Sequence, residues 1–224
     1  MIIGSVSENK DTEKRISVTP DNVKKFISNG FKVYLEKNYG EHLDINDEKF
    51  AENGAELFSN KEKIIKESDI LLQLNLPDED DLRGLSPNKN LIGVFDPVKN
   101  KNIISKLSGN KINVFSLELL PRITRAQSMD ILSSQANLAG YKAVIDAFSF
   151  FNKAIPMMMT AAGTIPAAKV LVVGAGVAGL QAIATAKRMG AIVFATDVRM
   201  ASKEQVESLG GKFLVVEGSE NLET

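Results

Sequence analysis

Three glycines in the C-terminal part of the chain have a spacing that suits phosphate binding. Gly174, Gly176 and Gly179 form a G-x-G-x-x-G motif directly after the apolar run Val170 to Val173. In such a motif the first glycine permits a tight turn and the second removes a Cβ where a pyrophosphate would approach the backbone. The third lets the following helix pack closely on the strand. The N–H groups and partial positive charge at the start of that helix would face the phosphates.

An acidic residue follows the glycines at the distance that dinucleotide-binding proteins use. Asp197 ends a second apolar run, Ala191 to Thr196, and could accept a hydrogen bond from an adenosine ribose. A lone glycine motif also fits a packing turn without a ligand, but here strand, turn, helix, strand and acid follow in register. A 2′-phosphate beside this carboxylate would be repelled, so we predict NAD(H) rather than NADP(H). The neighbouring Val177, Val198 and Arg199 complete the predicted cofactor-binding set, although Arg199 also fits a plain surface arginine.

Composition excludes several other kinds of site. The chain has 224 residues, a net charge of −1 and no cysteine, which excludes disulfides, thiol nucleophiles and cysteine metal sites. Its single histidine, His42, lies in a polar loop and is expected to be exposed or capping. The near-neutral charge argues against a nucleic-acid partner. The sequence predicts neither a signal peptide nor a membrane span, so we expect a soluble, cytoplasmic protein without a metal site.

The elements that would position these groups alternate between strand and helix up to residue 118. The predicted strands are Ile2–Val6, Phe31–Glu36, Glu56–Phe58, Asp69–Leu74, Leu91–Phe95 and Ile112–Ser116. The predicted helices follow Thr19 as N-cap, begin near Asn46, follow Ser59 as N-cap, and begin at Asn100. Such alternation is typical of a parallel, doubly wound sheet with helices on both faces.

A long helix, 129–152, is predicted to connect this flavodoxin- or Rossmann-like domain, 1–128, to the segment that holds the glycine motif, 153–224. After the helix, Ile155 to Ala168 is predicted to be a loop whose Met157, Met158 and Met159 fill a core or a domain interface. A full dinucleotide fold has two βαβαβ halves, and only the first fits before Thr224. The predicted fold class is therefore α/β, with two doubly wound parallel-sheet (Rossmann-like) domains, the second incomplete. We expect the chain to be truncated.

A second group of polar side chains surrounds the start of the long helix. Its members are Arg122, Arg125, Gln127, Asp130 and Ser133. By pattern alone this segment also fits a helix start with Ser128 as N-cap and a surface Arg–Asp pair of little energetic value. However, the segment follows the strand Ile112 to Ser116, and α/β proteins bind ligands in the loops beyond the carboxyl ends of parallel strands. The pattern thus leaves both a structural and a ligand-binding interpretation open.

Two stretches resemble one family. The run RITRAQSMDILSSQANLAGY from Arg122, and KVLVVGAGVAGLQAIATAKRMGA from Lys169 with TDVR ending at Arg199, closely resemble the NAD(H)-binding component of proton-translocating nicotinamide nucleotide transhydrogenase. This component is domain I, the N-terminal portion of the bacterial alpha subunit. The run RISVTP from Arg15 is shared with the same alanine dehydrogenase/transhydrogenase group, which includes alanine and lysine-forming saccharopine dehydrogenases. The resemblance covers essentially the whole chain but lacks the last portion of the family's domain I.

The resemblance implies a nicotinamide site. In the family an arginine, a glutamine, an aspartate and a serine surround the nicotinamide, and the matching positions are Arg122, Gln127, Asp130 and Ser133. Gln127 and Ser133 would hydrogen-bond the carboxamide and ribose. Arg122 and Asp130 would orient the ring, and with Gln127 they form the implied catalytic set.

The resemblance also implies an activity and partners. NAD(H) bound by this chain would exchange a hydride with NADP(H) on the beta subunit, in the proton-translocating, Re/Si-specific class of transhydrogenase. A membrane domain would couple this transfer to proton passage, and the chain would form a homodimer on the inner face of the inner membrane, held there through its partner subunits.

Two alternatives stay open. A stand-alone alanine-type dehydrogenase would need the lysine and histidine that its relatives carry after their third and fourth strands, and the stretches 72–77 and 92–97 contain neither. The other alternative is an inactive, truncated remnant that only folds and dimerises.

Overall fold

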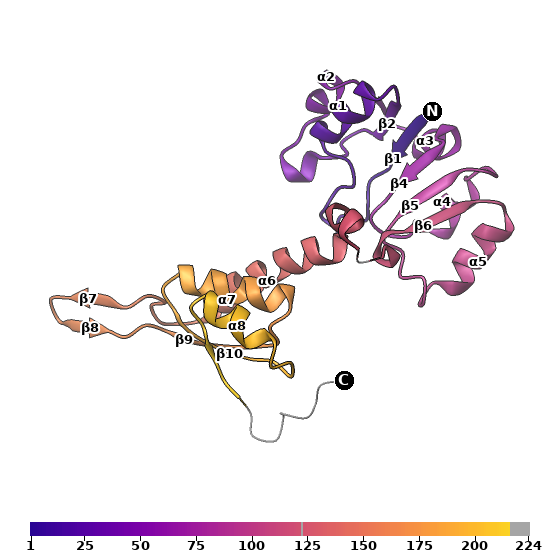
Figure 1. The fold of residues 1–224 in the computed structure, drawn as a ribbon. Coiled ribbons are helices and arrows are strands. Elements are labelled where there is room, and N and C mark those ends of the chain that lie inside the picture. The colour runs from indigo at the N-terminus through magenta and orange to yellow at the C-terminus, as the bar shows by residue number, and fades with distance from the viewer. Residues whose placement is uncertain (122, 216–224) are drawn as a thin grey trace. The chain divides into compact units, whose positions relative to one another are not determined.

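The computed structural model describes residues 1–121 and 123–215, and Figure 1 shows their fold. The chain forms two compact units, Met1–Asp130 (unit 1) and Ile131–Thr224 (unit 2). Unit 1 is an α/β unit with one six-stranded sheet, and unit 2 contains a smaller three-stranded sheet and a separate two-stranded hairpin. The predicted α/β fold class is confirmed.

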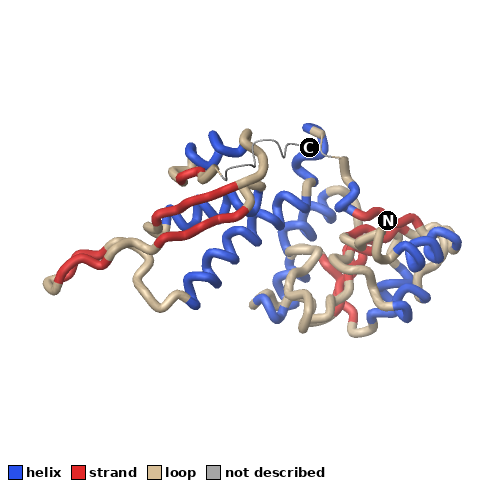
Figure 2. Tube along the Cα trace, turned by 90° about the horizontal axis from the view of Figure 1, so that it is seen from below, coloured by secondary structure: helices blue, strands red, loops and turns tan. Residues whose placement is uncertain are grey.

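Unit 1 is built on a parallel sheet of order β3-β2-β1-β4-β5-β6. Its strands are β1 (Ile2–Ser5), β2 (Lys32–Glu36), β3 (Ala55–Phe58), β4 (Ile70–Leu72), β5 (Asn90–Gly93) and β6 (Asn113–Ser116). Its α-helices are α1 (Pro20–Ser28), α2 (Asp47–Glu52), α3 (Lys61–Glu67), α4 (Glu79–Arg83) and α5 (Lys101–Gly109), with the 3-10 turns η1 (Glu41–Leu43), η2 (Leu117–Leu119) and η3 (Thr124–Met129). Helices flank this sheet in Figure 2. The strand order reverses between β1 and β4, which is where doubly wound sheets usually bind ligands.

Local capping explains where the helices of unit 1 begin. Thr19 caps α1 with a reciprocal capping box to Asn22, and Pro20 follows at the first helical position. The prediction that Ser59 caps α3 is wrong. That cap is Asn60, whose side chain accepts a hydrogen bond from the backbone N–H of Lys63 at 3.2 Å. An amide oxygen satisfies a free N–H as well as a hydroxyl does, so adjacent candidate caps compete closely.

Unit 2 begins with the long helix α6 (Ile131–Phe150). It continues through β7 (Met158–Thr160), β8 (Gly163–Ile165), β9 (Lys169–Val173), α7 (Val177–Arg188), β10 (Ile192–Thr196), α8 (Ser202–Ser208) and β11 (Lys212–Phe213). The parallel order β11-β10-β9 is the first half of a dinucleotide-binding sheet. Within the described residues β9 pairs only with β10, and Leu171 and Val173 are exposed. Ser128 lies inside η3 and does not cap α6, because η3 runs to Met129 and α6 starts only at Ile131.

Glycines hold α6 and α7 against each other and α7 against the glycine turn. A Cβ on Gly140 would lie 2.1 Å from the carbonyl oxygen of Ala178, so these two helices approach at backbone distance. The apolar core beneath them contains Val144, Ile183 and Val193. The position of the glycine motif in unit 2 is thus fixed by packing on two sides.

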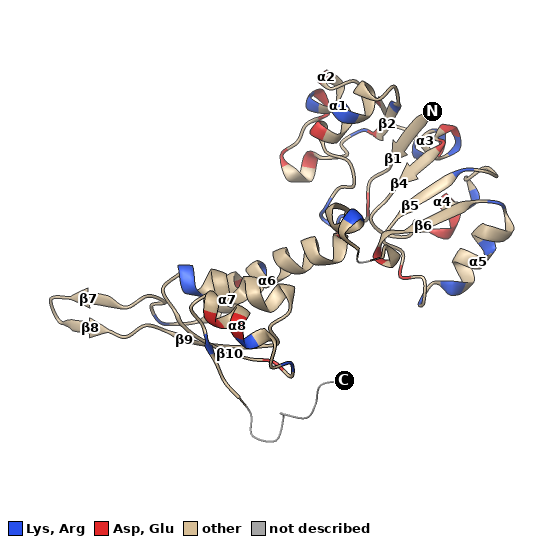
Figure 3. Cartoon of the chain, viewed as in Figure 1, with Lys and Arg blue, Asp and Glu red and all other residues tan. Residues whose placement is uncertain are grey.

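A projecting hairpin replaces the loop predicted at Ile155 to Ala168. Strands β7 and β8 form an antiparallel pair, and all six of their residues are exposed. Of the two places predicted for the methionines, the core is wrong for this unit, because Met157, Met158 and Met159 are exposed. The other, a domain interface, stays a prediction. In Figure 3 the hairpin carries neither of the two colours that mark charged residues. No helix in the described residues has the length and apolar character needed to cross a membrane.

Candidate functional site

The glycine turn joins β9 to α7 in a backbone conformation that requires glycine. Gly174 has φ +95°, in the left-handed region that side chains rarely adopt. A Cβ on Gly179 would lie 1.8 Å from the carbonyl oxygen of Gly174, so the helix packs directly on the turn. By contrast, a Cβ on Gly176 would meet no atom within 4 Å. The backbone at Gly176 therefore borders open space.

Helix α7 starts at that open space. Gly176 is its N-cap, and the first hydrogen bond of the helix runs from the N–H of Leu180 to the carbonyl of Gly176, at 2.8 Å. The N–H groups of the preceding helical residues have no acceptor within the helix, as at every helix start. The side chain of Val177 is half-exposed there. Together the N–H groups and the helix dipole provide an electropositive site for an anion.

Asp197 lies at the end of β10 and is tied to the glycine turn. Its Oδ2 accepts a hydrogen bond from the backbone N–H of Ala175 at 2.6 Å. The carboxyl side chain is only 6% exposed, and the guanidinium of Arg199 lies on it, with the side chain of Arg199 59% exposed. Hydrogen bonding by Arg199, and then by the two backbone N–H groups, holds the pKa of Asp197 well below its usual range, although burial acts in the opposite direction. A carboxylate at this place is therefore always ionised near neutral pH.

The predicted nicotinamide residues fall in both units. Gln127 and Asp130 lie in and just after η3, where the carbonyl of Gln127 accepts the backbone N–H of Asp130 at 3.3 Å. Gln127 is exposed. Ser133 is half-buried in the first turn of α6, in unit 2. Arg122 lies outside the described residues. The structure thus brings Gln127 and Asp130 together in one loop, and it separately joins the glycine turn to Asp197, Val198 and Arg199.

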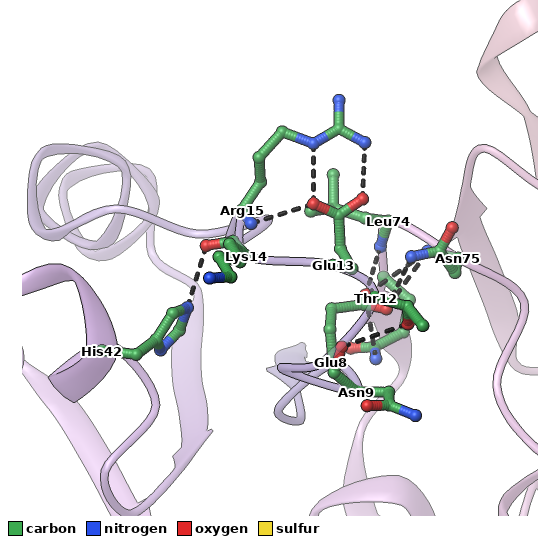
Figure 4. A network of polar contacts seen from close by, with 10 residues as sticks. Glu8, Asn9, Thr12, Glu13, Lys14, Arg15, His42, Leu74 and Asn75 are labelled. Carbon is green, nitrogen blue, oxygen red and sulfur yellow. Dashed lines mark hydrogen bonds and ion pairs between the residues drawn. The ribbon is translucent and has the colours of Figure 1, made fainter.

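Sequence reasoning missed a polar network in unit 1. Glu8 follows β1, and its carboxylate accepts the backbone N–H of Leu74 at 2.6 Å and the side-chain amide of Asn75 at 3.2 Å. Figure 4 shows these contacts beside the loop that carries Glu13 and Arg15. The residues come from loops after β1 and β4, at the switch point of the sheet. The partners are 66 to 67 residues apart in the sequence, so no local pattern could have indicated the pairing.

Glu13 and Arg15 form a two-point ion pair in the same loop. The Arg15 guanidinium donates to the two carboxylate oxygens of Glu13 at 2.8 and 2.6 Å. This hydrogen bonding lowers the pKa of Glu13 to about 2. His42, on the neighbouring η1, contacts the carbonyl of Lys14 through Nε2 at 2.9 Å and is exposed, in agreement with the prediction. Arg15 thus already has a carboxylate partner within its own loop.

The turn, the acid and the strand order define unit 2 as belonging to a dehydrogenase-type nucleotide-binding fold. Comparison with known proteins agrees. The family model described as alanine dehydrogenase/PNT, N-terminal domain, matches residues 4–139, and the corresponding C-terminal domain model matches residues 143–223. The chain belongs to the alanine dehydrogenase/PNT family.

Individual relatives point to the transhydrogenase branch of that family. The chain is 46% identical over 222 residues to an NAD(P) transhydrogenase subunit alpha sequence of Rhodospirillum rubrum, covering 97% of this chain and 58% of the relative. A transhydrogenase structure from Sinorhizobium meliloti is similar with a TM-score of 0.92 and 48% identity, covering 96% of this chain and 64% of that one. Alanine dehydrogenase of Methanococcus maripaludis is 25% identical, covering 94% and 57%. The resemblance predicted from the sequence is confirmed, and the chain spans less than two thirds of the length of each of these relatives.

Proposed function

We propose that this chain is the NAD(H)-binding component of a proton-translocating transhydrogenase. The observation that carries the proposal is the buried, ionised carboxylate of Asp197, tied by a 2.6 Å hydrogen bond to the glycine turn that opens α7. Its relatives at 46 to 48% identity are transhydrogenases, which adds independent support. The hydride would pass between NAD(H) on this chain and NADP(H) on a partner subunit, in the Re/Si-specific class of the enzyme.

The residues of unit 2 fit the adenosine and pyrophosphate end of NAD(H). The open space at Gly176 leaves room for a pyrophosphate against the backbone, and the N-terminus of α7 supplies N–H donors for it. The Asp197 carboxylate offers acceptors for a ribose diol. Val177 directly follows Gly176 and Val198 directly follows Asp197, and their exposed side chains would provide apolar surface for the nucleotide.

Four residues around η3 and the start of α6 are proposed to position the nicotinamide. The nicotinamide supplies the hydride chemistry when it is bound, and the protein fixes which ring face is offered and excludes water. Gln127 and Ser133 would hydrogen-bond the carboxamide and the ribose. Arg122 and Asp130 would orient the ring and set the field around it as it gains or loses positive charge. No proton needs to be transferred by any of these side chains.

The partners follow from the transhydrogenase assignment. We propose an NADP(H)-binding beta subunit as the hydride acceptor or donor, and a membrane domain that couples transfer to proton passage. The chain would then lie peripherally on the inner face of the inner membrane. The relatives are named as the alpha subunit of their enzyme, which implies an assembly of several subunits.

We further propose a homodimer, with the β7–β8 hairpin as its contact. A two-stranded hairpin alone is at best marginally stable in water, so this one needs a packing partner. Met159, the middle residue of β7, is 83% exposed, and no charged residue lies between Lys153 and Lys169. A second copy presents the same uncharged surface, which allows a symmetric contact without charge repulsion.

The stand-alone amino-acid dehydrogenase is the weaker proposal. An oxo acid brings its own carboxylate, which needs a free cation and a proton-transfer group. At the switch point of unit 1, Asn75 is bound by the Glu8 carboxylate and Arg15 by the Glu13 carboxylate. The carboxylates of Glu8 and Glu13 at this edge of the sheet would repel the carboxylate of an oxo acid. Oxidation of NADH that depends on pyruvate and ammonia, by this chain alone, would reverse the ranking.

Titration with NADH tests the proposal directly. The chain has no tryptophan, so the fluorescence of the nucleotide can be followed without energy transfer from that residue. We expect NADH to bind more tightly than NADPH, and Asp197→Ala to weaken NADH binding by about 1–3 kcal/mol, the scale of leaving polar partners unpaired. Hydride transfer from NADPH to an NAD⁺ analogue is then measured after mixing with the membrane and NADP(H)-binding subunits of a related transhydrogenase. Equal affinity for the two nucleotides, or an unchanged Asp197→Ala variant, would contradict the assignment, and NADH binding without transfer would indicate the inactive remnant.

A further inference from the structure

All the acceptor positions of the Asp197 carboxylate are occupied by this chain itself. Oδ1 accepts from the backbone N–H of Arg199 at 2.8 Å and from its Nε at 3.1 Å. Oδ2 accepts from the backbone N–H of Ala175 at 2.6 Å and from a terminal guanidinium nitrogen of Arg199 at 3.3 Å. A carboxylate has about four lone-pair positions. Two are taken by the backbone and two by one guanidinium.

The two kinds of donor differ in how readily they can leave. The backbone N–H groups belong to the glycine turn and to the bend after β10, so they are fixed by the fold. Among the described residues the guanidinium makes hydrogen bonds and an ion pair only with this carboxylate, and the Arg199 side chain is 59% exposed while the carboxylate is 6% exposed. The Arg199 guanidinium therefore covers the Asp197 carboxylate. An incoming hydrogen-bond donor must take the place that the guanidinium now occupies.

A ribose diol and the Arg199 guanidinium each require the same two acceptor positions. A diol brings two O–H donors, and with the two backbone N–H groups it would again fill the carboxylate. We infer that Arg199 competes with the adenosine ribose for Asp197, and that it must leave the carboxylate before NAD(H) binds. This inference rests on the proposed function, and it reverses the expectation that Arg199 is a favourable contact for NAD(H).

The same displacement affects the preference for NADH over NADPH. Once released, the guanidinium is a free cation beside the ribose, where NADPH carries its 2′-phosphate. Arginine pairs well with phosphate. Arg199 thus lowers the affinity for NADH, which must displace it, and raises the affinity for NADPH, which gains a cation. Arg199 therefore reduces the preference for NADH over NADPH that Asp197 creates.

Arg199→Ala tests this with NADH and NADPH as probes. An ion pair whose guanidinium is largely exposed has a modest stability, so removing the competitor should tighten NADH binding about two- to fivefold. Loss of the released cation should weaken NADPH binding about tenfold, the scale of a charge-assisted hydrogen bond. The control is Arg188→Ala, which removes an equal charge from an exposed position in the last turn of α7 and should change neither affinity.

A double-mutant cycle separates competition from a general effect. Because Arg199 acts only through Asp197, Arg199→Ala should leave NADH affinity unchanged in an Asp197→Ala background. The gain in the wild-type background should also shrink at high salt, which already weakens the exposed pair. Weaker or unchanged NADH binding by Arg199→Ala would overturn the competition while leaving the NAD(H) assignment intact. A wild-type chain that binds no NADH would overturn both.

Discussion

A side chain that is proposed to position the nicotinamide can be distinguished by kinetics from one that only binds it. Gln127 is exposed in η3, and its amide is proposed to fix the carboxamide of the ring. Because misplacement of reacting atoms reduces rate strongly, we expect Gln127→Ala to lower hydride transfer in the reconstituted complex about tenfold or more. NADH affinity should change much less. If affinity and rate fall by the same factor, Gln127 is a binding residue only. Arg125→Ala serves as the control, since that exposed neighbour has no proposed role.

The Glu13–Arg15 pair predicts an acid-sensitive contribution to the stability of unit 1. Arg15 lowers the folded-state pKa of Glu13 from 4.5 to about 2. A depressed pKa stabilises the folded state above the unfolded-state value, and that stability is lost as the pH falls. We expect the contribution, on the order of 1 kcal/mol for a partly exposed pair, to be complete above about pH 5 and to disappear toward pH 2. The free energy of unfolding of Glu13→Gln and wild type should therefore converge on acidification. A constant difference across this range would contradict the role of ionisation.

Some structural roles of single residues can be predicted from the sequence. The spacing of the motif predicts a tight turn at Gly174 and close helix packing at Gly179, and the structure has a positive φ at Gly174 and a close backbone approach at Gly179. A conformation of this kind depends on a few neighbouring residues, so a short motif can indicate it. The contact between Glu8 and Asn75 cannot be predicted in this way, because it exists only after β1 and β4 pair. The same holds for the network of Ser5, Tyr39 and Gln73, in which the Ser5 hydroxyl contacts the Tyr39 hydroxyl at 2.8 Å and donates to the Gln73 side chain at 3.1 Å.

At the level of elements, the fold depends on the contact between α6 and α7. Gly140 faces the backbone of Ala178, and a Cβ would come within 2.1 Å of its carbonyl oxygen. We expect Gly140→Ala to destabilise unit 2 by about 1–3 kcal/mol, the usual cost of overpacking. The helix preference for alanine would act in the opposite direction and so cannot explain a loss. Gly109→Ala at the end of α5 is the matched control, because a Cβ there meets nothing within 4 Å. Chemical denaturation of both variants checks the expectation, and equal stabilities would contradict it.

Elements with strong patterns were predictable, and weakly patterned ones were not. The alternating strands and helices of unit 1 and the β9–α7–β10 segment follow apolar runs and caps that the sequence shows. The sequence pattern does not indicate helix α4, because its five residues are mostly acidic and give no apolar stripe. The sequence predicts a loop where the β7–β8 hairpin lies, because two strands of three residues without alternation resemble a loop between prolines. Such elements depend on packing rather than on local preference.

At the level of the whole molecule, the exposed apolar surface of unit 2 predicts self-association. The β7–β8 hairpin exposes Met158, Met159 and Ile165, and exposed apolar patches mark interaction sites. A glutamate in place of Met159 in β7 would place like charges together in a symmetric dimer, and its burial would be costly. We expect Met159→Glu to weaken dimerisation at least about tenfold, the scale of one unpaired polar group. Light scattering coupled to size-exclusion chromatography measures the mass across a dilution series.

The control for this prediction must add the same charge elsewhere. Val98 is 88% exposed in unit 1, outside the hairpin, so Val98→Glu changes net charge and surface polarity equally. We expect Val98→Glu to remain dimeric and Met159→Glu to become monomeric with its NADH affinity unchanged, since the hairpin does not belong to the glycine turn. A wild-type chain that is monomeric at every concentration would reject the dimer. A Met159→Glu variant that stays dimeric would instead place the contact on another surface, and the apolar residues Leu171 and Val173 of β9 would then be the next to test.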